Sequence, residues 1–360
     1  MELQRTSSTP LASSELTPLS TAVTKTPLEY SGSRTPSTLS ATGAPYPRNT
    51  YHLLSAPRPN YHLLPLTQVT RLTYNGTPSA VRSSGVRENL QDHPTAFLRW
   101  SSSVPPPPEE DPANLSDPGY DAAMGVIYRN NHTGPWTVSS GNIFGFFTPK
   151  HIQLPCSVIS AGSAQSTGQY LRPDLHPTVI AGCEKMKAAT LRLLKENKLA
   201  VVEAGFYRVA TFDAIMHPLS RGFLQITTPD PFALPKVDWR ALSNPFDWDV
   251  MISSIRWQQN TMSQAPALKV GVGAVPTNSD PTLTDAQLKA TLRESMWPSL
   301  AHLSGTCPML KREEGGVVDK YLKVYGVEGL RIVDASVPNC AGGALAGDSV
   351  CGGGEGSGYY

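Results

Sequence analysis

The residues best suited to chemistry in this sequence are the histidine of His302-Leu-Ser-Gly-Thr and the polar run Asp334-Ala-Ser. An imidazole can accept or release a proton near neutral pH, because its ordinary pKa is about 6.5. Residues 330–333 predict a short buried strand that delivers Asp334 at its carboxyl end, where α/β folds bind ligands. Residue types alone leave two interpretations of His302 open, a proton-transferring group and a structural histidine beside a Gly-Thr turn, and they favour the structural one.

Other catalytic or metal-binding chemistries find less support. A hydrolase that uses Ser304 or Ser336 with His302 is the weaker alternative, because the sequence has no Gly-x-Ser-x-Gly elbow. The five cysteines are an odd number without a Cys-x-x-Cys or metal-like spacing, which argues against a disulfide framework or a zinc site. We expect most of them to be buried or free thiols.

Charge and hydropathy narrow the classes of partner. The 30 Lys and Arg residues nearly balance the 29 Asp and Glu residues, and the net charge of +1 gives no electrostatic case for nucleic acid or an anionic membrane surface. No run of 18 apolar residues is present, so no membrane span is expected. Residues 1–19 lack the apolar core of a secretory signal, so we expect no signal peptide in the chain as written.

The elements that must position these residues follow from periodicity and caps. Apolar residues around Val69 predict a strand that ends before the turn dipeptide Asn75-Gly76. Further expected elements are strands near 204–212 and 222–228, and helices over 178–199, from Pro245 to about Met262, and from Thr284, whose Gln287 completes a capping box. This order predicts a layered α+β arrangement in which helices cover one face of a sheet.

The block that begins at His302 continues through Gly316-Val-Val-Asp, Val324-Tyr-Gly-Val and Leu330-Arg-Ile-Val-Asp-Ala-Ser. This block is similar to the C-terminal signature of the glucose-methanol-choline (GMC) flavoprotein oxidoreductases. Five upstream motifs match the family in the same order. They comprise residues 58–64 together with 68–71, residues 85–94, residues 133–135, residues 217–222, and residues 242–245 together with Asp247. The resemblance therefore extends over residues 58–338.

The resemblance implies an FAD-dependent oxidoreductase that acts on the CH–OH group of a small-molecule alcohol. His302 would be the base that takes the hydroxyl proton, and the hydride would pass to flavin N5. The Val69 backbone would contact the FAD adenine, and Asp334 and Ala335 would lie against the pyrophosphate. His217 is expected to be structural. The substrate, the electron acceptor and the oligomeric state are left open.

The sequence also departs from the family pattern. No Gly-x-Gly-x-x-Gly turn precedes residue 60, and the family segment G-A-x-x-[ST]-P-x-L-L is absent between Val69 and Gly85. The match stops at Pro338, so a second catalytic His or Asn is not assigned, and Asn339 is too close to His302 to take that role. We interpret the chain as a truncated or internally deleted member, with a catalytically inactive fragment that no longer binds FAD as the alternative.

The expected domain organisation follows from these matches. It comprises a disordered Ser/Thr/Pro-rich segment (1–57), a remnant of the FAD-binding domain (58–95), a substrate-binding domain (96–300), a C-terminal catalytic segment (301–338) and a Gly-rich tail (339–360), with both ends disordered. The substrate domain should hold a mixed, largely antiparallel sheet covered by helices. No chemistry is assigned to His93, which the family places near the domain junction. Trp136 and the phenylalanines of the segment 144–147 are expected to line either a substrate pocket or the core.

Overall fold

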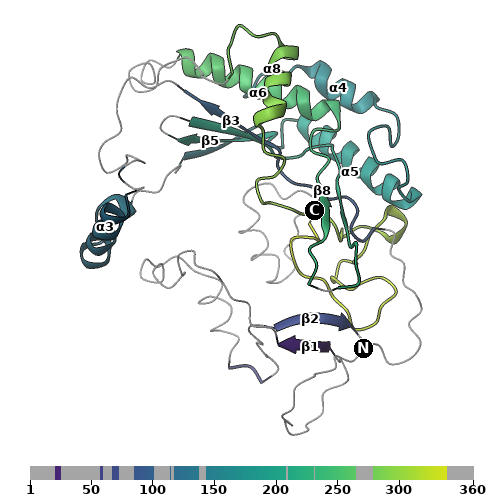
Figure 1. Cartoon of the computed structure of the whole chain (residues 1–360). Helices are drawn as coiled ribbons and strands as arrows, with labels where there is room; N and C mark the ends of the chain where they lie inside the picture. The colour runs from purple at the N-terminus through teal and green to yellow at the C-terminus, as the bar shows by residue number, and fades with distance from the viewer. Residues whose placement is uncertain are drawn as a thin grey trace.

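The computed structural model describes residues 21–25, 57–59, 67–72, 85–100, 114, 117–137, 143–207, 210–230, 232–264 and 279–338. Its main body is an antiparallel sheet packed under a layer of helices (Figure 1). Among the described helices, none is long and apolar enough to cross a membrane. The layered α+β architecture expected from the sequence is confirmed.

The central sheet has four strands in the order β3-β6-β5-β4. These are β3 (Thr95–Arg99), β6 (Ala210–Ile215), β5 (Val202–Tyr207) and β4 (Ile143–Phe147). Phe97 pairs with Phe212, and Ala96 pairs with Asp213. Because side chains alternate along a strand, Phe97 and Phe212 share one face of the sheet while Ala96 and Asp213 share the other.

Helices cover the face that carries Asp213. Ser254 and Gln258 of α6 (Pro245–Gln264) both hydrogen-bond the Asp213 carboxylate, which places this helix directly on β6. The layer is completed by α4 (Cys156–Ala164), α5 (Pro177–Lys195) and α8 (Asp285–Ser295) (Figure 1). The main core lies between helices and sheet and includes Leu98, Leu194, Ile215, Met251, Ile255 and Leu292. Its burial is the main stabilising contribution to this body.

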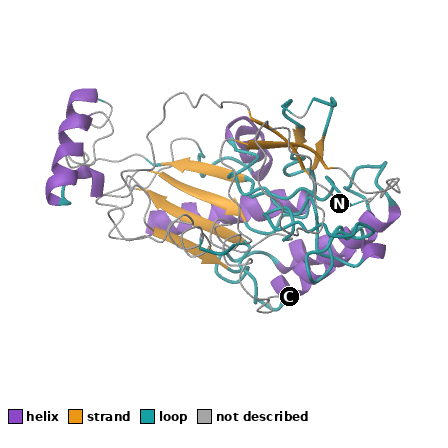
Figure 2. Cartoon of the chain, turned by 90° about the horizontal axis from the view of Figure 1, so that it is seen from below, coloured by secondary structure: helices purple, strands orange, loops and turns teal. Residues whose placement is uncertain are grey.

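Three smaller units lie outside this body. The strands β7 (Phe223–Gln225) and β8 (Lys236–Asp238) form a two-stranded ribbon, and β1 (Thr21–Lys25) pairs antiparallel with β2 (Thr67–Leu72). Helix α3 (Pro118–Asn131) stands apart from the sheet in both views (Figures 1 and 2). The short 3-10 helix η4 (Pro135–Thr137) brings Trp136 against α3, where its indole donates to Asp121 at 2.9 Å. Trp136 thus packs against α3, the helix that precedes it in the chain.

The three expected helices are all present, whereas some of the expected strands differ from the observed ones. Helices α5, α6 and α8 match the predictions, and the Thr284–Gln287 capping box is formed. The single strand expected near 204–212 is instead two, β5 and β6, which pair antiparallel with Tyr207 opposite Ala210. The alternation of apolar residues continues from one strand into the next, so periodicity alone could not separate the two strands.

The buried strand expected at residues 330–333 is wrong. This segment makes one isolated bridge, Arg331 to Lys323, and Val333 is 57% exposed. A strand needs a continuous hydrogen-bonded neighbour, and among the described residues this segment has only that bridge.

Of the segment 1–57, which was expected to be disordered, the structure describes Thr21–Lys25, which pairs with β2 as β1. The remainder of that segment, apart from residue 57, lies outside the described residues. So do the tail 339–360 and the turn at Asn75-Gly76.

Candidate active site around His93 and His302

The segment that carries His302 is held against the segment that carries His93 by backbone pairing. Gln91 and Ser304 exchange two hydrogen bonds, with N–O distances of 3.0 and 2.9 Å. Gly305 adopts a φ of +81°, and a Cβ there would lie 2.8 Å from the backbone oxygen of Asn89. Glycine is needed for this close approach, because other residues strain at positive φ and would collide. The Gly-Thr turn after His302 therefore brings it to the upstream segment.

A single buried carboxylate, that of Asp92, fixes the backbone on both sides of the contact. Its Oδ1 accepts hydrogen bonds from the backbone N–H groups of His93 at 2.7 Å, Leu300 at 3.1 Å and His302 at 3.2 Å. Its Oδ2 accepts from the Ser299 hydroxyl. A carboxylate with several N–H donors is a strong local anchor, because charge-assisted hydrogen bonds are stronger than neutral ones.

The rings of His93 and His302 meet edge to face. Their Nδ1 atoms are 3.1 Å apart, their centroids are 5.1 Å apart, and the planes are inclined at 86°. His93 is buried, whereas His302 is half-buried. Burial lowers the pKa of His93 to about 4, with repulsion from His302 as a second cause and the Asp92 charge as a smaller opposing one. His93 is therefore neutral at physiological pH.

A third histidine lies close to this pair. Burial lowers the pKa of His217 to about 4, and the charges of His93 and Arg221 lower it further. The chain after His217 joins the His93 segment through a two-way backbone bridge between Leu90 and Gly222. His93 interacts with both other rings, since it contacts His302 and also lowers the pKa of His217. The role of His217, expected to be structural, stays a prediction.

The structure places the expected flavin contacts in two separate regions. Asp334 is exposed in a turn, where its Oδ1 accepts from the backbone N–H of Ser336 at 2.8 Å and from the Ser336 hydroxyl. The turn, which includes Ala335, is tied to the segment after His302, because the Cys307 N–H donates to the Ser336 carbonyl at 2.7 Å. Val69 lies in β2, where its backbone pairs with Val23. His302 and the Asp334 turn thus belong to one structural unit.

The described residues fit a flavin only in part. The half-buried His302 ring and the exposed Asp334 turn are suited to lie beside a bound cofactor. A dinucleotide pyrophosphate, however, is usually held at a helix N-terminus in a parallel sheet. Within the described ranges, all three sheets are antiparallel. No group of three or more metal-binding side chains lies together in this part of the chain either.

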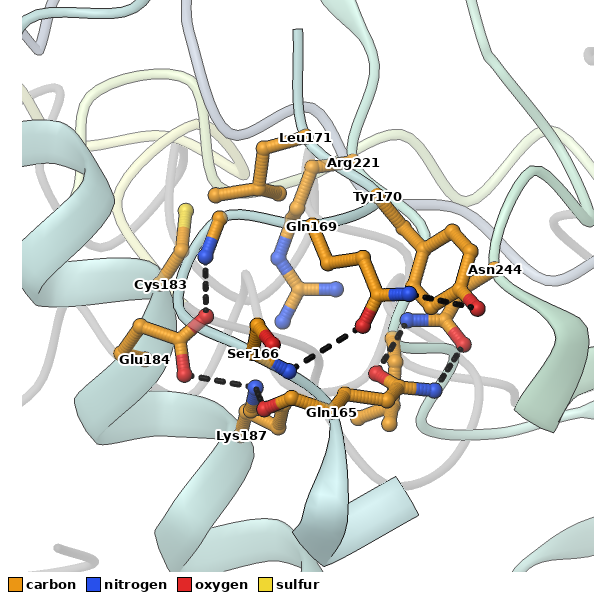
Figure 3. Close-up of a pocket in the computed structure, with 12 residues that line it drawn as sticks. Gln165, Ser166, Gln169, Tyr170, Leu171, Cys183, Glu184, Lys187, Arg221 and Asn244 are labelled. Carbon is orange, nitrogen blue, oxygen red and sulfur yellow. Dashed lines mark hydrogen bonds and ion pairs between the residues drawn. The ribbon is translucent and has the colours of Figure 1, made fainter. Parts of the chain in front are cut away.

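Arg221 and side chains of α5 line a polar pocket (Figure 3). Its lining side chains are largely bonded to one another: the amides of Gln165 and Asn244 exchange hydrogen bonds of 2.7 and 2.9 Å, and Lys187 pairs with Glu184 at 2.6 Å. Neither His93 nor His302 lines it. The pocket is therefore separate from the histidine pair.

An aromatic surface begins next to the histidine pair. Thr95 and Trp297 exchange two backbone hydrogen bonds of 2.9 and 2.8 Å, which brings Trp297 over β3. The rings of Phe97 and Trp297 have centroids 4.6 Å apart, and Phe97 and Phe144 each lie 6.0 Å from Phe212. Phe144 and Trp297 are 48% and 56% exposed. This face is opposite to the one covered by α6.

Several of these residues could not be assigned a role from the sequence. His93 was assigned no chemistry, and Asp92, Phe97 and Trp297 were not singled out. The available signal for Asp92 and His93 was the run Asn-Leu-Gln-Asp-His-Pro, in which polar residues crowd just before a strand. For Trp297 the sequence carries no signal, because its contact with Phe97 depends on a backbone bridge across some two hundred residues.

Comparisons with known proteins agree with the fold. The family model described as GMC oxidoreductase matches residues 218–345. The chain is 29% identical over 261 residues to a dehydrogenase of Emericella nidulans, Dehydrogenase xptC, covering 70% of this chain and 41% of that protein. It is 30% identical over 266 residues to the GMC oxidoreductase family protein Mala s 12 of Malassezia sympodialis, covering 73% of this chain and 40% of that protein.

Solved structures show the same relationship. A fungal aryl-alcohol oxidase superposes with a TM-score of 0.68 at 27% identity, covering 75% of this chain and 47% of that one. An FAD-dependent oxidoreductase from Chaetomium thermophilum gives a TM-score of 0.66 at 28% identity, covering 74% and 47%. The chain spans about two fifths of the length of these curated relatives and just under half of these structures. By motif, sequence and fold, this chain belongs to the GMC oxidoreductase family.

Proposed function

We propose that this chain carries the proton-accepting side of an FAD-dependent oxidoreductase that oxidises the CH–OH group of an alcohol, with His302 as the base. The observation that carries the proposal is the pairing of a half-buried His302 with a buried, neutral His93 through their Nδ1 atoms. This contact occupies one nitrogen of His302. The other, Nε2, hydrogen-bonds no described residue and is available to a substrate.

Oxidation of an alcohol requires the site to accept a proton and to pass on a hydride. The alcohol loses its hydroxyl proton to Nε2 of His302, and its carbon-bound hydrogen leaves as hydride, which produces the carbonyl compound. FAD, when bound, supplies the hydride acceptor at N5. The Val69 backbone and the turn at Asp334 and Ala335 would hold that cofactor. Asp92 and Gly305 keep His302 in place while it takes the proton.

The aromatic surface supports an apolar or aryl alcohol as substrate. Exposed aromatic rings favour a ligand with an apolar carbon skeleton, because stacking and apolar burial both stabilise such a ligand. Phe144 and Trp297 offer such rings on the strand face that begins at Thr95. The solved relative described as an aryl-alcohol oxidase is consistent with this class.

A catalytically inactive fragment of a GMC enzyme that no longer binds FAD is the second candidate. The observation that favours it is the antiparallel character of the described sheets, which offers no pyrophosphate site at a helix N-terminus. The two candidates differ in flavin affinity and can be separated directly.

The first experiment mixes the purified chain with FAD, removes free flavin on a desalting column and records the visible spectrum. Flavin absorbance that co-elutes with the protein supports the oxidoreductase, and a colourless protein fraction supports the inactive fragment. With flavin bound, benzyl alcohol oxidation is compared for the wild type and His302→Asn. We expect a loss of roughly 10²–10⁴-fold.

The matched control is His132→Asn. His132 is exposed at the end of α3 with a φ of 53°, a conformation that asparagine tolerates. Its activity should equal that of the wild type. Equal activity of His302→Asn and His132→Asn would show that His302 is not the base.

A further inference from the structure

We propose that His93 is a positioning residue that keeps the proton of neutral His302 on Nδ1 and so leaves Nε2 bare to accept the substrate proton. This inference rests on the proposed function, in which His302 is the base. It concerns a residue 209 positions upstream, from the other segment of the site.

The contact between the rings requires one proton. A hydrogen bond between two imidazole nitrogens needs one N–H donor and one bare acceptor, and each neutral imidazole carries only one N–H. At 3.1 Å the two Nδ1 atoms are within hydrogen-bond distance. Either His302 donates and keeps Nε2 bare, or His93 donates and His302 must carry its proton on Nε2. Only the first arrangement gives a base.

The difference in burial selects the first arrangement. When the pair carries one positive charge, that charge lies on His302, because His93 is only 2% exposed and burial disfavours a charged ring. Charged His302 has N–H groups at both nitrogens, so it must donate to a bare Nδ1 of His93. The proton then leaves from Nε2, since removing the one on Nδ1 would bring two lone pairs together in a buried contact.

The surroundings hold this geometry. The Asp92 carboxylate bonds the backbone N–H groups of both histidines, and the Thr95 hydroxyl donates to the His93 carbonyl at 2.9 Å. The ionisable groups that act on His93 are His302, Asp92 and His217. His217 is itself buried and neutral, so it adds no charge that would move the proton.

The test reads the tautomer directly and needs no flavin. The chain is labelled with ¹⁵N-histidine, and long-range ¹H–¹⁵N correlation spectra are recorded above pH 7.5, with the His302 signals identified by their loss in His302→Asn. We expect a protonated Nδ1 and a bare Nε2 for His302. A wild-type spectrum with the proton of His302 on Nε2 overturns the proposal, and this measurement requires no variant at His93.

Two substitutions of His93 then separate positioning from packing. His93→Phe keeps a ring but has no acceptor, so His302 should shift toward the Nε2-protonated form. His93→Asn offers its carbonyl oxygen near the former Nδ1 and should retain the Nδ1 proton. An Nδ1 proton that persists in the phenylalanine variant, with native circular dichroism, contradicts the role of His93.

If the chain binds flavin, the same variants give a kinetic reading. His93→Phe should lower kcat on the order of 10-fold or more with little change in KM, and His93→Asn should recover most of it. Equal kcat in both variants overturns the positioning role. If the chain binds no FAD but shows the expected tautomer, the proposed function fails while the inference about His93 and His302 holds. Failure of the proposed function and failure of the inference are therefore distinguishable.

Discussion

The carboxyl of Asp213 should make the stability of this fold depend on pH. Asp213 is fully buried between β6 and α6, and its Oδ1 accepts hydrogen bonds from Ser254 Oγ and Gln258 Nε2, both at 2.8 Å. Its buried Oδ2 forms no hydrogen bond with any described residue. Burial raises the pKa from 3.8 to about 7, against the smaller opposing effect of the two hydrogen bonds.

The sign follows from linkage. Because the folded pKa lies above the unfolded one, the protonated carboxyl stabilises the fold fully below pH 3.8, and this contribution is lost as the pH rises through about 7. At about 1.4 kcal/mol per pH unit, the loss between pH 5 and pH 8 is about 2–3 kcal/mol. Asp213→Asn removes the ionisation. Its free energy of unfolding, relative to wild type, should therefore rise by that amount over the same range.

The measurement is urea unfolding followed by tryptophan fluorescence at pH 5, 6.5 and 8, with Glu328→Gln, an exposed carboxyl, as the control. The change with pH is the test, because an unpartnered amide nitrogen in Asp213→Asn adds a constant cost of about 1–3 kcal/mol at every pH. A difference between variant and wild type that stays constant from pH 5 to pH 8 would refute the reasoning.

Three further predictions concern the same body. Gly222→Ala should destabilise the chain by about 1–3 kcal/mol in thermal unfolding, because its Cβ would collide with the carbonyl oxygen of Asp238, and an unchanged melting temperature would contradict this. The pKa of His217 is lowered from 6.5 to about 4, so the neutral ring contributes stability above pH 6.5 that is lost as the pH falls through 4. Between pH 7.5 and pH 5, the free energy of unfolding of His217→Gln in urea titrations should therefore fall by about 2 kcal/mol less than that of the wild type. An equal fall in both proteins would count against this reasoning. Leu194→Ala should cost about 2–5 kcal/mol, whereas Leu234→Ala, at a side chain 88% exposed, should cost little, and equal effects would show that Leu194 is not in the core.

Helices were the part of the fold that sequence predicted best. The start of α8 follows from Thr284 and Gln287, which bond each other's backbone within one turn. The start of α6 follows from Asn244, whose Oδ1 accepts from the Phe246 N–H at 3.0 Å. These signals are readable because donor and acceptor lie two or three residues apart in the chain.

Strands were predicted less well. Residues 204–212 alternate as a strand should, yet the chain turns back within them. Residues 330–333 are apolar enough for a buried strand, yet Val333 is exposed. A strand exists only where a partner offers hydrogen bonds, and that partner is set by the whole fold.

The candidate site likewise has one part that the sequence predicted and another that only the fold revealed. The family and the candidate base His302 follow from the sequence, because the motif around His302 is contiguous and its glycine is required by the turn that follows. The tertiary structure decided what His302 touches: Asp92 and His93 reach it only because the Gln91–Ser304 bridge joins segments some two hundred residues apart. Such contacts depend on packing between segments that are distant in the chain, so the local sequence around His302 could not predict which side chain would lie beside its ring.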